Sequence, residues 1–381
     1  MKFNIKKNRR FIEAVFTLTG TIIGAGILGL PYVFSQSGFF IGLFWLVVLT
    51  GILIYVNLCL GEVSLRTKET HQLTGYAEKY LGKKGKNWML FSVIFGIYSA
   101  LVAYLIGEGQ SFSTLFTGNS NHEIWFALGF WVLMTALVYG GLKRLKQVES
   151  YGVLTIIAII LAIFFVMLPD VSVSNLRQIN YSMFFFPFGV TLFALLGFMS
   201  IPELKRELAN HERLLKRAVV IGIAVPAVIY AMFTLVFVGV LGKNVADVAT
   251  ISLTGVLGKI LIVLGIFTMM TSYFVLNFSL KDTFIFDLKR IRKTSEFFFV
   301  SLLPLILYLI VTLFNFAGFV RVLGIGGTVS GGVAGILILL MNLKAKKHGN
   351  RKPEYSMRIN NLVMWILSLI FVLGVVTEFI F

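Results

Sequence analysis

The sequence predicts an all-α membrane protein of eleven transmembrane helices, arranged as two inverted five-helix repeats followed by one C-terminal helix. Three observations predict this class. Of the 381 residues, 57% are apolar and only 13% are charged, which a soluble globular domain does not show. The apolar residues form long continuous runs, whereas a transmembrane β-barrel would show short alternating segments. A glycine and proline motif in the first run recurs in the sixth, which indicates internal repetition.

The apolar runs are long enough to cross a hydrocarbon core of about 30 Å as helices. They lie near residues 11–34, 39–60, 88–116, 124–142, 150–168, 184–203, 218–242, 257–280, 296–315, 319–342 and 359–381. The single cysteine, Cys59, lies in an apolar stretch and can form no internal disulfide. All four histidines fall in hydrophilic connections, so we expect no membrane-embedded histidine metal site.

The charges predict how the chain is oriented. Lys and Arg number 34 against 17 Asp and Glu, a formal net charge of +17. If the N-terminus is cytoplasmic, every basic residue falls on the cytoplasmic side except Arg177, Lys243, Lys259 and Arg321. This positive-inside pattern predicts a cytoplasmic N-terminus and an outside C-terminus in the cell membrane. In this interpretation the excess of basic residues serves to orient the chain in the lipid bilayer, which argues against nucleic-acid binding.

The internal repeat is carried by two hexapeptides. Residues 26–31 (GILGLP) and 197–202 (GFMSIP) both read Gly, two apolar, one small, one apolar, Pro. Pro31 and Pro202 are 171 residues apart, and the same shift places runs three to five on runs eight to ten. Because five is odd, the second set enters the membrane from the opposite side. We expect a cytoplasmic basic arm at 1–10, the first repeat at 11–168, the second at 169–342, and a basic loop with the eleventh helix at 343–381.

Both motif helices are expected to break at mid-membrane. The first contains Gly20, Gly24 and Gly26 within seven residues, and glycine is poor helix material. The sixth contains two glycines between two prolines. Since a helix breaks in hydrocarbon only where its freed groups face a cavity or a ligand, paired breaks predict a transporter binding site. The alternative is that the Gly20–Gly24 pair only lets helices pack closely.

The freed groups predict the ligand. N–H groups around Ala25 and Gly26 would lie at a half-helix N-terminus, which favours a carboxylate. Carbonyls around Leu195 and Leu196 would suit an ammonium group, so the natural ligand is an amino acid zwitterion. Aromatic side chains nearby are pocket candidates, although aromatic residues at helical spacing more often serve packing. The expected substrate-binding residues are Gly24, Ala25, Gly26, Ile27, Tyr104, Phe193, Leu195, Leu196, Gly197 and Phe198.

These stretches resemble a known family. Residues 20–32 (GTIIGAGILGLPY) are similar to the first helix of the amino acid/auxin permease family, particularly its prokaryotic aromatic amino acid permease branch. Weaker similarities at 74–82, 193–203 and 271–274 extend the resemblance, in order, over nearly the whole chain. The resemblance implies the LeuT-type fold of the larger amino acid, polyamine and organocation superfamily, with amino acid uptake driven by a cation gradient.

The resemblance also implies a sodium site between the first and eighth helices. Its ligands would be the carbonyls of Gly20, Ile23 and Thr268 and the hydroxyls of Thr271 and Ser272. A neutral cage of oxygens suits a monovalent cation. The alternative is that both hydroxyls only bond to their own helix. Residues 151–168 contain no lysine of the kind that replaces sodium in some relatives, which favours Na⁺ without excluding H⁺.

Glu108 is the acid that the sequence places most clearly inside a span, about 9 Å outward from the centre of the third helix. An acid at that depth is costly, so it is a candidate to carry a proton or to contact the substrate amine or the cation. The alternative is a wet outer vestibule, or pairing with Lys259 or Arg321. Relatives carry small residues at this position.

We therefore expect a secondary active transporter that takes up a neutral L-amino acid, aromatic and branched ones being candidates, with Na⁺ or H⁺ by alternating access. The main alternative is an amino-acid-sensing receptor on the same fold that does not transport. A channel would need a polar helix stripe, and an enzyme a cluster of acids, histidines or cysteines at depth, and neither pattern is present. No cofactor is expected beyond the coupled ion, and the sequence leaves the oligomeric state and the particular amino acid open.

Overall fold

A computed structural model of the chain describes residues 5–140, 145–286 and 293–380. Within these ranges every regular element is helical. The α-helices are α1 (Ile5–Ile22), α2 (Gly26–Ser37), α3 (Phe39–Leu65), α4 (Leu73–Thr117), α5 (Glu123–Tyr139), α6 (Leu145–Met167), α7 (Val173–Leu176), α8 (Phe186–Ala194), α9 (Ile201–Glu207), α10 (Leu215–Leu241), α11 (Gly255–Phe286), α12 (Lys293–Phe297), α13 (Leu303–Leu313), α14 (Phe319–Gly326), α15 (Gly332–His348) and α16 (Asn361–Ile380). Six short 3₁₀ turns are η1 (Leu168–Asp170), η2 (Tyr181–Met183), η3 (Phe198–Ser200), η4 (Glu212–Leu214), η5 (Gly242–Asn244) and η6 (Ala249–Ser252), and two π-helical turns are η7 (Phe298–Leu302) and η8 (Gly327–Gly331).

The helices confirm the multi-pass all-α class. In the described part of the chain, eight helices are long and apolar enough to cross a membrane, or nine if the bent pair α1–α2 counts as one span. Two shorter apolar helices, at 123–139 and 154–170, coincide with the remaining predicted runs. Helix α4 starts fifteen residues before its predicted run, at Leu73, and continues through Gly82. The φ of Gly82 is +75°, which glycine adopts without steric cost, so the amphipathic start of α4 bends there relative to its apolar part.

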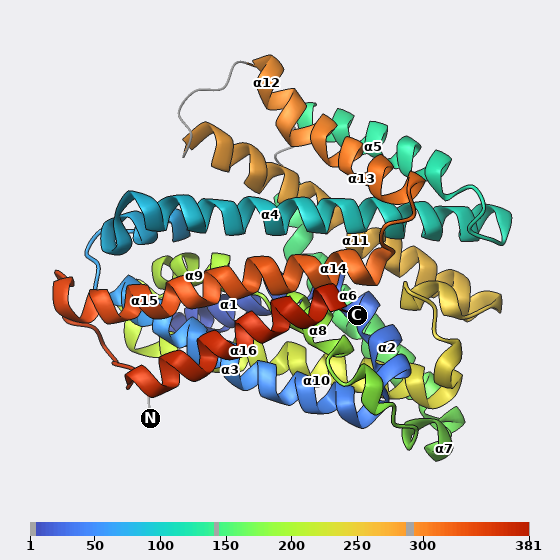
Figure 1. Cartoon of the computed structure of the whole chain (residues 1–381), viewed down its shortest axis with the longest axis horizontal. Helices are drawn as coiled ribbons and strands as arrows, with labels where there is room; N and C mark the ends of the chain where they lie inside the picture. Colours follow the sequence, from blue (N-terminus) through green and yellow to red (C-terminus); the bar gives the residue numbers. More distant parts are fainter. Residues whose placement is uncertain (1–4, 141–144, 287–292, 381) are drawn as a thin grey trace.

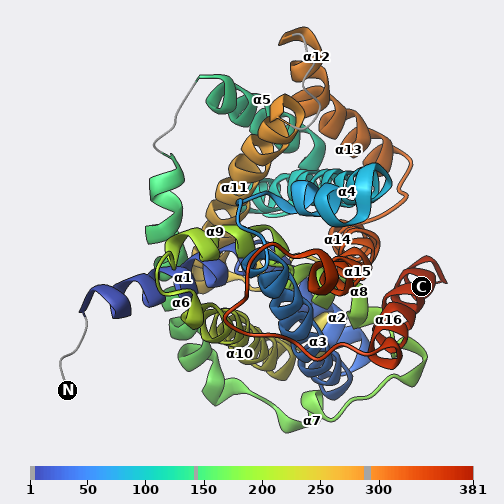
Figure 2. The same cartoon turned by 90° about the vertical axis from the view of Figure 1, so that its left-hand side faces the viewer.

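Two groups of helices lie side by side along the molecule. Figures 1 and 2 show α4, α5, α11 and α13 on one side and α1, α2, α3, α8 and α10 on the other. Helices α14 and α15 lie between the groups and contact α4 on one side and α8 and α3 on the other. The start of α1, the end of α3 and the end of α15 lie on one membrane face, which we call the basic face because Arg9, Arg66, Lys346 and their neighbours lie there. The start of α14 lies on the opposite face.

Two helices are broken near the middle of the protein. Helices α1 and α2 would form one span, but they are bent by 57° at residues 23–25. Helix α8 ends at Ala194, and α9 resumes at Ile201 after the η3 turn. Both breaks fall at the glycine-containing stretches that the sequence marks, and α10 packs against α1, α2 and α9 around them.

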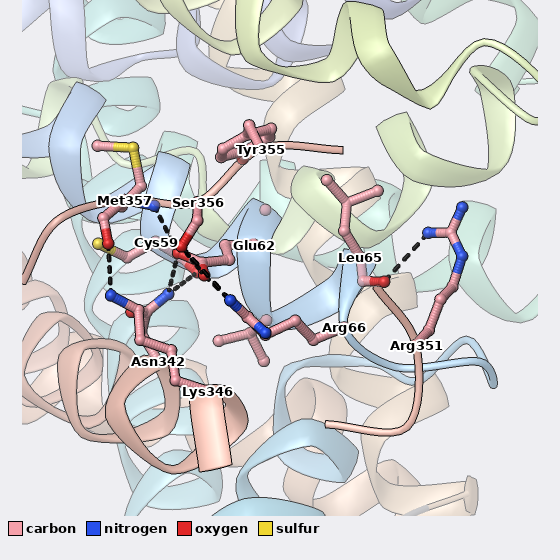
Figure 3. Close-up of polar contacts among 12 residues, drawn as sticks. Cys59, Glu62, Leu65, Arg66, Asn342, Lys346, Arg351, Tyr355, Ser356 and Met357 are labelled. Carbon is pink, nitrogen blue, oxygen red and sulfur yellow. Dashed lines mark hydrogen bonds and ion pairs between the residues drawn. The ribbon is translucent and has the colours of Figure 1, made fainter. Parts of the chain in front are cut away.

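A buried polar cluster around Glu62 fixes the end of α3 on the basic face (Figure 3). One carboxylate oxygen of Glu62 accepts hydrogen bonds from Arg66 Nε and Ser356 Oγ, both at 2.8 Å. The other accepts the N–H of Met357 at 2.7 Å and Asn342 Nδ2 at 3.1 Å. The cluster therefore joins α3 to α15 and to the segment that leads into α16, holding these elements in register around the broken helices.

Candidate substrate and cation site

The first break releases specific backbone groups. The N–H of Gly24 bonds to the carbonyl of Ile22 at 2.9 Å, two residues back, instead of the carbonyl of Gly20, four residues back. The N–H groups of Ala25 and Gly26 donate to no acceptor in the described part of the chain. They lie at the start of α2, where unpaired donors and the positive end of the helix dipole favour an anion. The break thus leaves unpaired N–H groups at the start of α2 and, at Gly20, a carbonyl without its helical partner.

The second break lies at the end of α8. The N–H of Leu195 still bonds back into the helix, to the carbonyls of Thr191 at 3.2 Å and Leu192 at 3.3 Å. Gly197 then departs from helical geometry, with φ −141° and ψ 11°. Ala194 is therefore the last helical residue, and its carbonyl points past the end of the helix, where the negative end of the dipole favours a cation.

The two breaks are in contact with each other. A Cβ placed on Gly26 would lie 2.8 Å from the Cα of Ala194 and 3.3 Å from Cδ1 of Phe193, so only glycine fits here. A third helix, α10, also contacts both breaks: the hydroxyl of Tyr230 lies within hydrogen-bond distance of the carbonyl of Ile22, at 2.6 Å, and of that of Ala194, at 3.0 Å. Unpaired donors of one helix therefore lie beside a terminal carbonyl of the other that accepts one bond, from Tyr230, and keeps a second lone pair, which is an arrangement that suits a zwitterion.

Helices α4 and α11 contribute side chains to the first break. A Cβ on Gly24 would lie 3.4 Å from the Ser272 hydroxyl and 4.0 Å from the Tyr104 hydroxyl. Thr271 donates to the carbonyls of Phe267 and Thr268, each at 3.0 Å. The hydroxyl of Thr271 thus bonds to its own helix, as the alternative interpretation expected, although its lone pairs stay open to a cation. Of the side chains that α4 and α11 contribute, Ser272 has the hydroxyl nearest to Gly24.

The predicted cation ligands fit a monovalent cation in chemistry. The carbonyls of Gly20 and Ile23 have lost their helical partners, because Gly24 bonds to Ile22 and Ile27 bonds weakly to Gly24 at 3.4 Å. These carbonyls and the neutral hydroxyls of α11 are oxygen donors without a formal charge, which is the kind of group that suits a monovalent cation. The carbonyl of Thr268 already accepts the Thr271 hydroxyl, so it is the most engaged member of the predicted set.

The remaining predicted substrate residues divide into two kinds. Phe193 lies between Gly26 on one side and Gly326 of α14 and Gly327 of η8 on the other, beside the junction of the breaks. Leu195, Ile27 and Phe198 are buried, at 0%, 1% and 5% exposure. Leu196 points toward Gly331 of the η8 turn, where its methyl group lies 3.0 Å from the position of an added Cβ. Leu196 therefore packs between elements rather than lining the point where the breaks meet.

Glu108 is fully buried, and neither carboxylate oxygen has a hydrogen-bond partner among the described residues. It lies on α4 four residues after Tyr104, so the two side chains share a helix face, one turn apart. Neighbouring Gly107 packs against Met269 of α11 and Phe319 of α14. An unpartnered acid on the helix face that reaches the first break is a functional candidate.

Several important residues were not found by sequence reasoning. Tyr230 gives no local signal, because it is one tyrosine in an apolar run and its role depends on where α10 lies. Glu62 and Glu378 also lie inside candidate spans, at 39–65 and 361–380, and sequence reasoning singled out neither. Lys205 of α9 is buried and donates to the carbonyls of Ser64 and Thr67 at 2.7 Å. In the sequence Lys205 stands beside Arg206 and gives no sign that it is buried.

Contacts join the elements that flank the breaks on both sides of them. Toward the basic face, Ser200 donates to the Thr21 hydroxyl at 2.7 Å and Thr17 donates to Glu207 at 2.8 Å, joining α1 to α9. Toward the opposite face, η6 packs against α2, α4 and α11.

The two broken helices, their contact, and the surrounding bundle define a membrane permease of the LeuT type. The model of the tryptophan/tyrosine permease family matches residues 7–380, and the chain belongs to this family. The crystal structure of MhsT in complex with L-phenylalanine superposes with a TM-score of 0.65, covering 96% of this chain and 97% of that one at 16% identity, which confirms the predicted fold. The protein is accordingly a permease and not an enzyme.

Curated relatives agree with this membership. The tyrosine-specific transport system 1 of Haemophilus influenzae is 25% identical over 96% of this chain and 94% of its own length. The tyrosine-specific transport system 2 of the same organism is 30% identical over 62% of this chain, and glutamine transporter 2 of Aliivibrio fischeri is 24% identical over 62%. Those two matches span 60% and 63% of the relatives' own lengths.

Proposed function

We propose that this protein is a secondary active transporter that carries a neutral L-amino acid across the cell membrane in symport with a cation. The observation that supports it most directly is the contact between the two breaks. The free N–H groups of Ala25 and Gly26 would receive the substrate carboxylate, and the carbonyls at the end of α8, from Ala194 to Leu196, would receive the ammonium group. Phe193 and Tyr104 place aromatic surface beside this position, which suits an aromatic or large apolar side chain.

The coupled cation is proposed to be Na⁺, held by the carbonyls of Gly20 and Ile23 and the hydroxyls of Ser272 and Thr271. The released carbonyls support this assignment, because an oxygen-only neutral cage suits a monovalent ion. Glu108 is proposed as the proton or amine contact. We also propose that the basic face is cytoplasmic, since that orientation places nearly all basic residues inside.

The experiment is uptake into proteoliposomes from a panel of radiolabelled amino acids under an imposed Na⁺ gradient, an imposed pH gradient, or neither. We expect accumulation of at least one neutral amino acid above empty vesicles, and stronger accumulation under the Na⁺ gradient. Ser272→Ala should raise the Na⁺ concentration needed for half-maximal uptake. Thr283→Ala is the matched control, because it removes a hydroxyl from the same helix that bonds only to Ser279 at 2.8 Å. Absence of gradient-driven uptake for the whole panel would refute the proposal, and binding without accumulation would favour the sensing receptor.

A further inference from the structure

The hydroxyl of Tyr230 lies between the carbonyls at the ends of both broken helices. It is fully buried on α10, a helix that is itself continuous through this region. Its oxygen is 2.6 Å from the Ile22 oxygen and 3.0 Å from the Ala194 oxygen. Ile22 is the last residue of α1 and Ala194 the last of α8, so a single side chain from a third helix reaches the terminal carbonyls of two half-helices.

The two carbonyls are not equally satisfied. A carbonyl oxygen has two lone pairs, and a phenol has one O–H to donate. The Ile22 oxygen accepts the N–H of Gly24 at 2.9 Å as well as the shorter bond from Tyr230, so both of its lone pairs are engaged. In the described part of the chain, the Ala194 oxygen accepts only the longer bond from Tyr230. Since the single proton is directed mainly at Ile22, Ala194 keeps an acceptor site open.

An open acceptor at this position is suited to a cationic donor. The Ala194 carbonyl lies at the C-terminal end of α8, where the helix dipole is negative, and in a buried site where a hydrogen bond to a charge is strong. The N–H groups of Ala25 and Gly26 lie on the other side of the contact between Gly26 and Ala194. A donor and an acceptor site are thus held close together, and Tyr230 determines how far apart the two half-helix ends lie.

We infer that Tyr230 is a positioning residue for the substrate ammonium group: it satisfies the carbonyl of Ile22, keeps the two breaks at one separation, and reserves the carbonyl of Ala194 for the ligand. This inference rests on the proposed transport of an amino acid and refines it. It moves the ammonium acceptor from Leu195 and Leu196, which the sequence favoured, to Ala194. Tyr230 does not itself bond to the substrate, so its effect is on recognition of the ammonium group and not on side-chain choice.

The test compares Tyr230→Phe with Thr234→Ala. The first removes only the hydroxyl and keeps the ring. The second is a matched control, because Thr234 lies one turn further along α10 and its hydroxyl bonds to the backbone of Tyr230 and Ala231 in its own helix. L-Tyrosine uptake is measured in proteoliposomes, with hydroxyphenyllactate, which has a hydroxyl in place of the ammonium group, as the competitor.

We expect Tyr230→Phe to raise KM for L-tyrosine about tenfold, the size that loss of a well-placed hydrogen bond to a charged group produces, with Vmax nearly unchanged. We also expect the preference for L-tyrosine over hydroxyphenyllactate to fall, since the ammonium acceptor is no longer held in place. Thr234→Ala should leave both quantities as in the natural sequence. An unchanged preference in Tyr230→Phe, or equal effects of the two variants, would overturn the inference.

A second readout needs no substrate. Hydrogen–deuterium exchange of the purified permease should be faster at residues 20–27 and 194–199 in Tyr230→Phe and not in Thr234→Ala, because the hydroxyl joins both breaks. Equal exchange in the two variants would overturn the bridging role of Tyr230. A failure of the proposed function is distinguishable, because it would abolish uptake in the natural sequence while leaving this difference in exchange intact.

Discussion

Gly26 and Ala194 are in backbone contact at the point where the two broken helices meet. A Cβ on Gly26 would lie 2.8 Å from the Ala194 Cα and 3.0 Å from its Cβ. Real Cβ atoms do not approach backbone this closely, so α2 and α8 can be this near only while residue 26 is glycine. The glycine therefore sets the spacing of the donors and the acceptor in the proposed substrate site.

Gly26→Ala should accordingly separate the breaks and impair transport. Overpacking of this kind costs about 1–3 kcal/mol, which corresponds to a fall in uptake of roughly tenfold or more. Gly24→Ala is the comparison, because its added Cβ would meet the Ser272 hydroxyl at 3.4 Å, an ordinary contact. Initial uptake rates, normalised to the amount of folded protein in the vesicles, measure the effect. A Gly26→Ala rate equal to that of Gly24→Ala would contradict the close-contact argument.

The Glu62 cluster should be a stability determinant of the basic face. In Glu62→Gln, one carboxylate oxygen becomes an NH₂ group that faces the donors of Arg66 and Ser356, or those of Met357 and Asn342. Leaving buried donors unpaired costs about 1–3 kcal/mol each, so the apparent melting temperature in detergent should fall by several degrees.

The control for this prediction is Glu78→Gln. Glu78 forms an ion pair with Lys86 at 2.8 Å, and its side chain is 52% exposed. Exposed pairs contribute little because water screens them, so its melting temperature should stay close to that of the natural sequence. Equal shifts in the two variants would show that the buried cluster adds no stability beyond an exposed ion pair.

Asp247 should make the face opposite the basic face sensitive to pH. Its carboxylate accepts the N–H of Phe319 at 2.9 Å, capping the first turn of α14. Burial raises the pKa of Asp247 above its ordinary value, and the N–H donors of Phe319 and Val320 offset part of that rise. Among its neighbours, Glu123 interacts repulsively with Asp247 when both carboxylates are charged.

The sign of the effect follows from the raised pKa. The folded state holds the Asp247 proton more tightly than the unfolded chain, so this group stabilises the fold fully below its ordinary pKa of 3.8 and the contribution is lost as the pH rises through the folded value. Asp247→Asn keeps an acceptor for Phe319 and cannot ionise. The melting temperature of the natural sequence should therefore rise, relative to Asp247→Asn, as the pH is lowered from neutral toward 4. A constant difference over this range would exclude the effect.

The positions of the breaks were predictable, but the groups that complete the site were not. The spacing of Gly20, Gly24 and Gly26 locates the break after α1, because the free-energy cost of helical conformation at a glycine depends on that residue alone. Helix α8 ends at Ala194, directly before the predicted Leu195 and Leu196, and the N–H of Leu195 makes the last bond back to the carbonyl of Thr191. No local rule distinguishes the position of that last bond.

Long-range partners account for the other misses. The apolar run of α3 ends near residue 60, whereas the helix continues to Leu65 because residues 342, 356 and 357 supply donors to the buried Glu62. Tyr230 likewise acquires its role from carbonyls 208 and 36 residues away in sequence. Such contacts depend on how the helices pack, which composition and periodicity do not determine.

Removing the side chain of Glu378 on α16 should compensate for the substitution of a neighbouring glycine. Its carboxylate lies between Gly189 of α8 and Gly324 of α14, and a Cβ on either glycine would overlap it. Gly189→Ala should therefore destabilise the protein by about 1–3 kcal/mol through overpacking. Gly51→Ala, with nothing within 4 Å of the added Cβ, should be neutral. For Gly189 a second clash, with the backbone oxygen of Gly324 at 2.8 Å, would remain without Glu378, whereas the three atoms nearest an added Cβ on Gly324 all belong to Glu378. Adding Glu378→Ala to Gly324→Ala should therefore recover most of the melting temperature that Gly324→Ala loses, and additive losses in that double variant would contradict the proposed contact.

Glu108 should determine whether protons can drive accumulation. A charged carboxylate with no partner in a fully buried site is costly, so Glu108 is stable there only when it binds a proton or a cationic donor. In Glu108→Gln the side chain keeps its shape but cannot carry a proton. If Glu108 carries the coupled proton, the variant loses accumulation driven by a pH gradient and retains exchange of labelled for unlabelled substrate, because exchange moves no net proton.

Glu123→Gln, on α5 at the start of its first turn, is the matched control and should keep both activities. Accumulation by Glu108→Gln at the level of the natural sequence would remove Glu108 from the coupling mechanism, leaving Na⁺ at the released carbonyls of Gly20 and Ile23 as the driving ion.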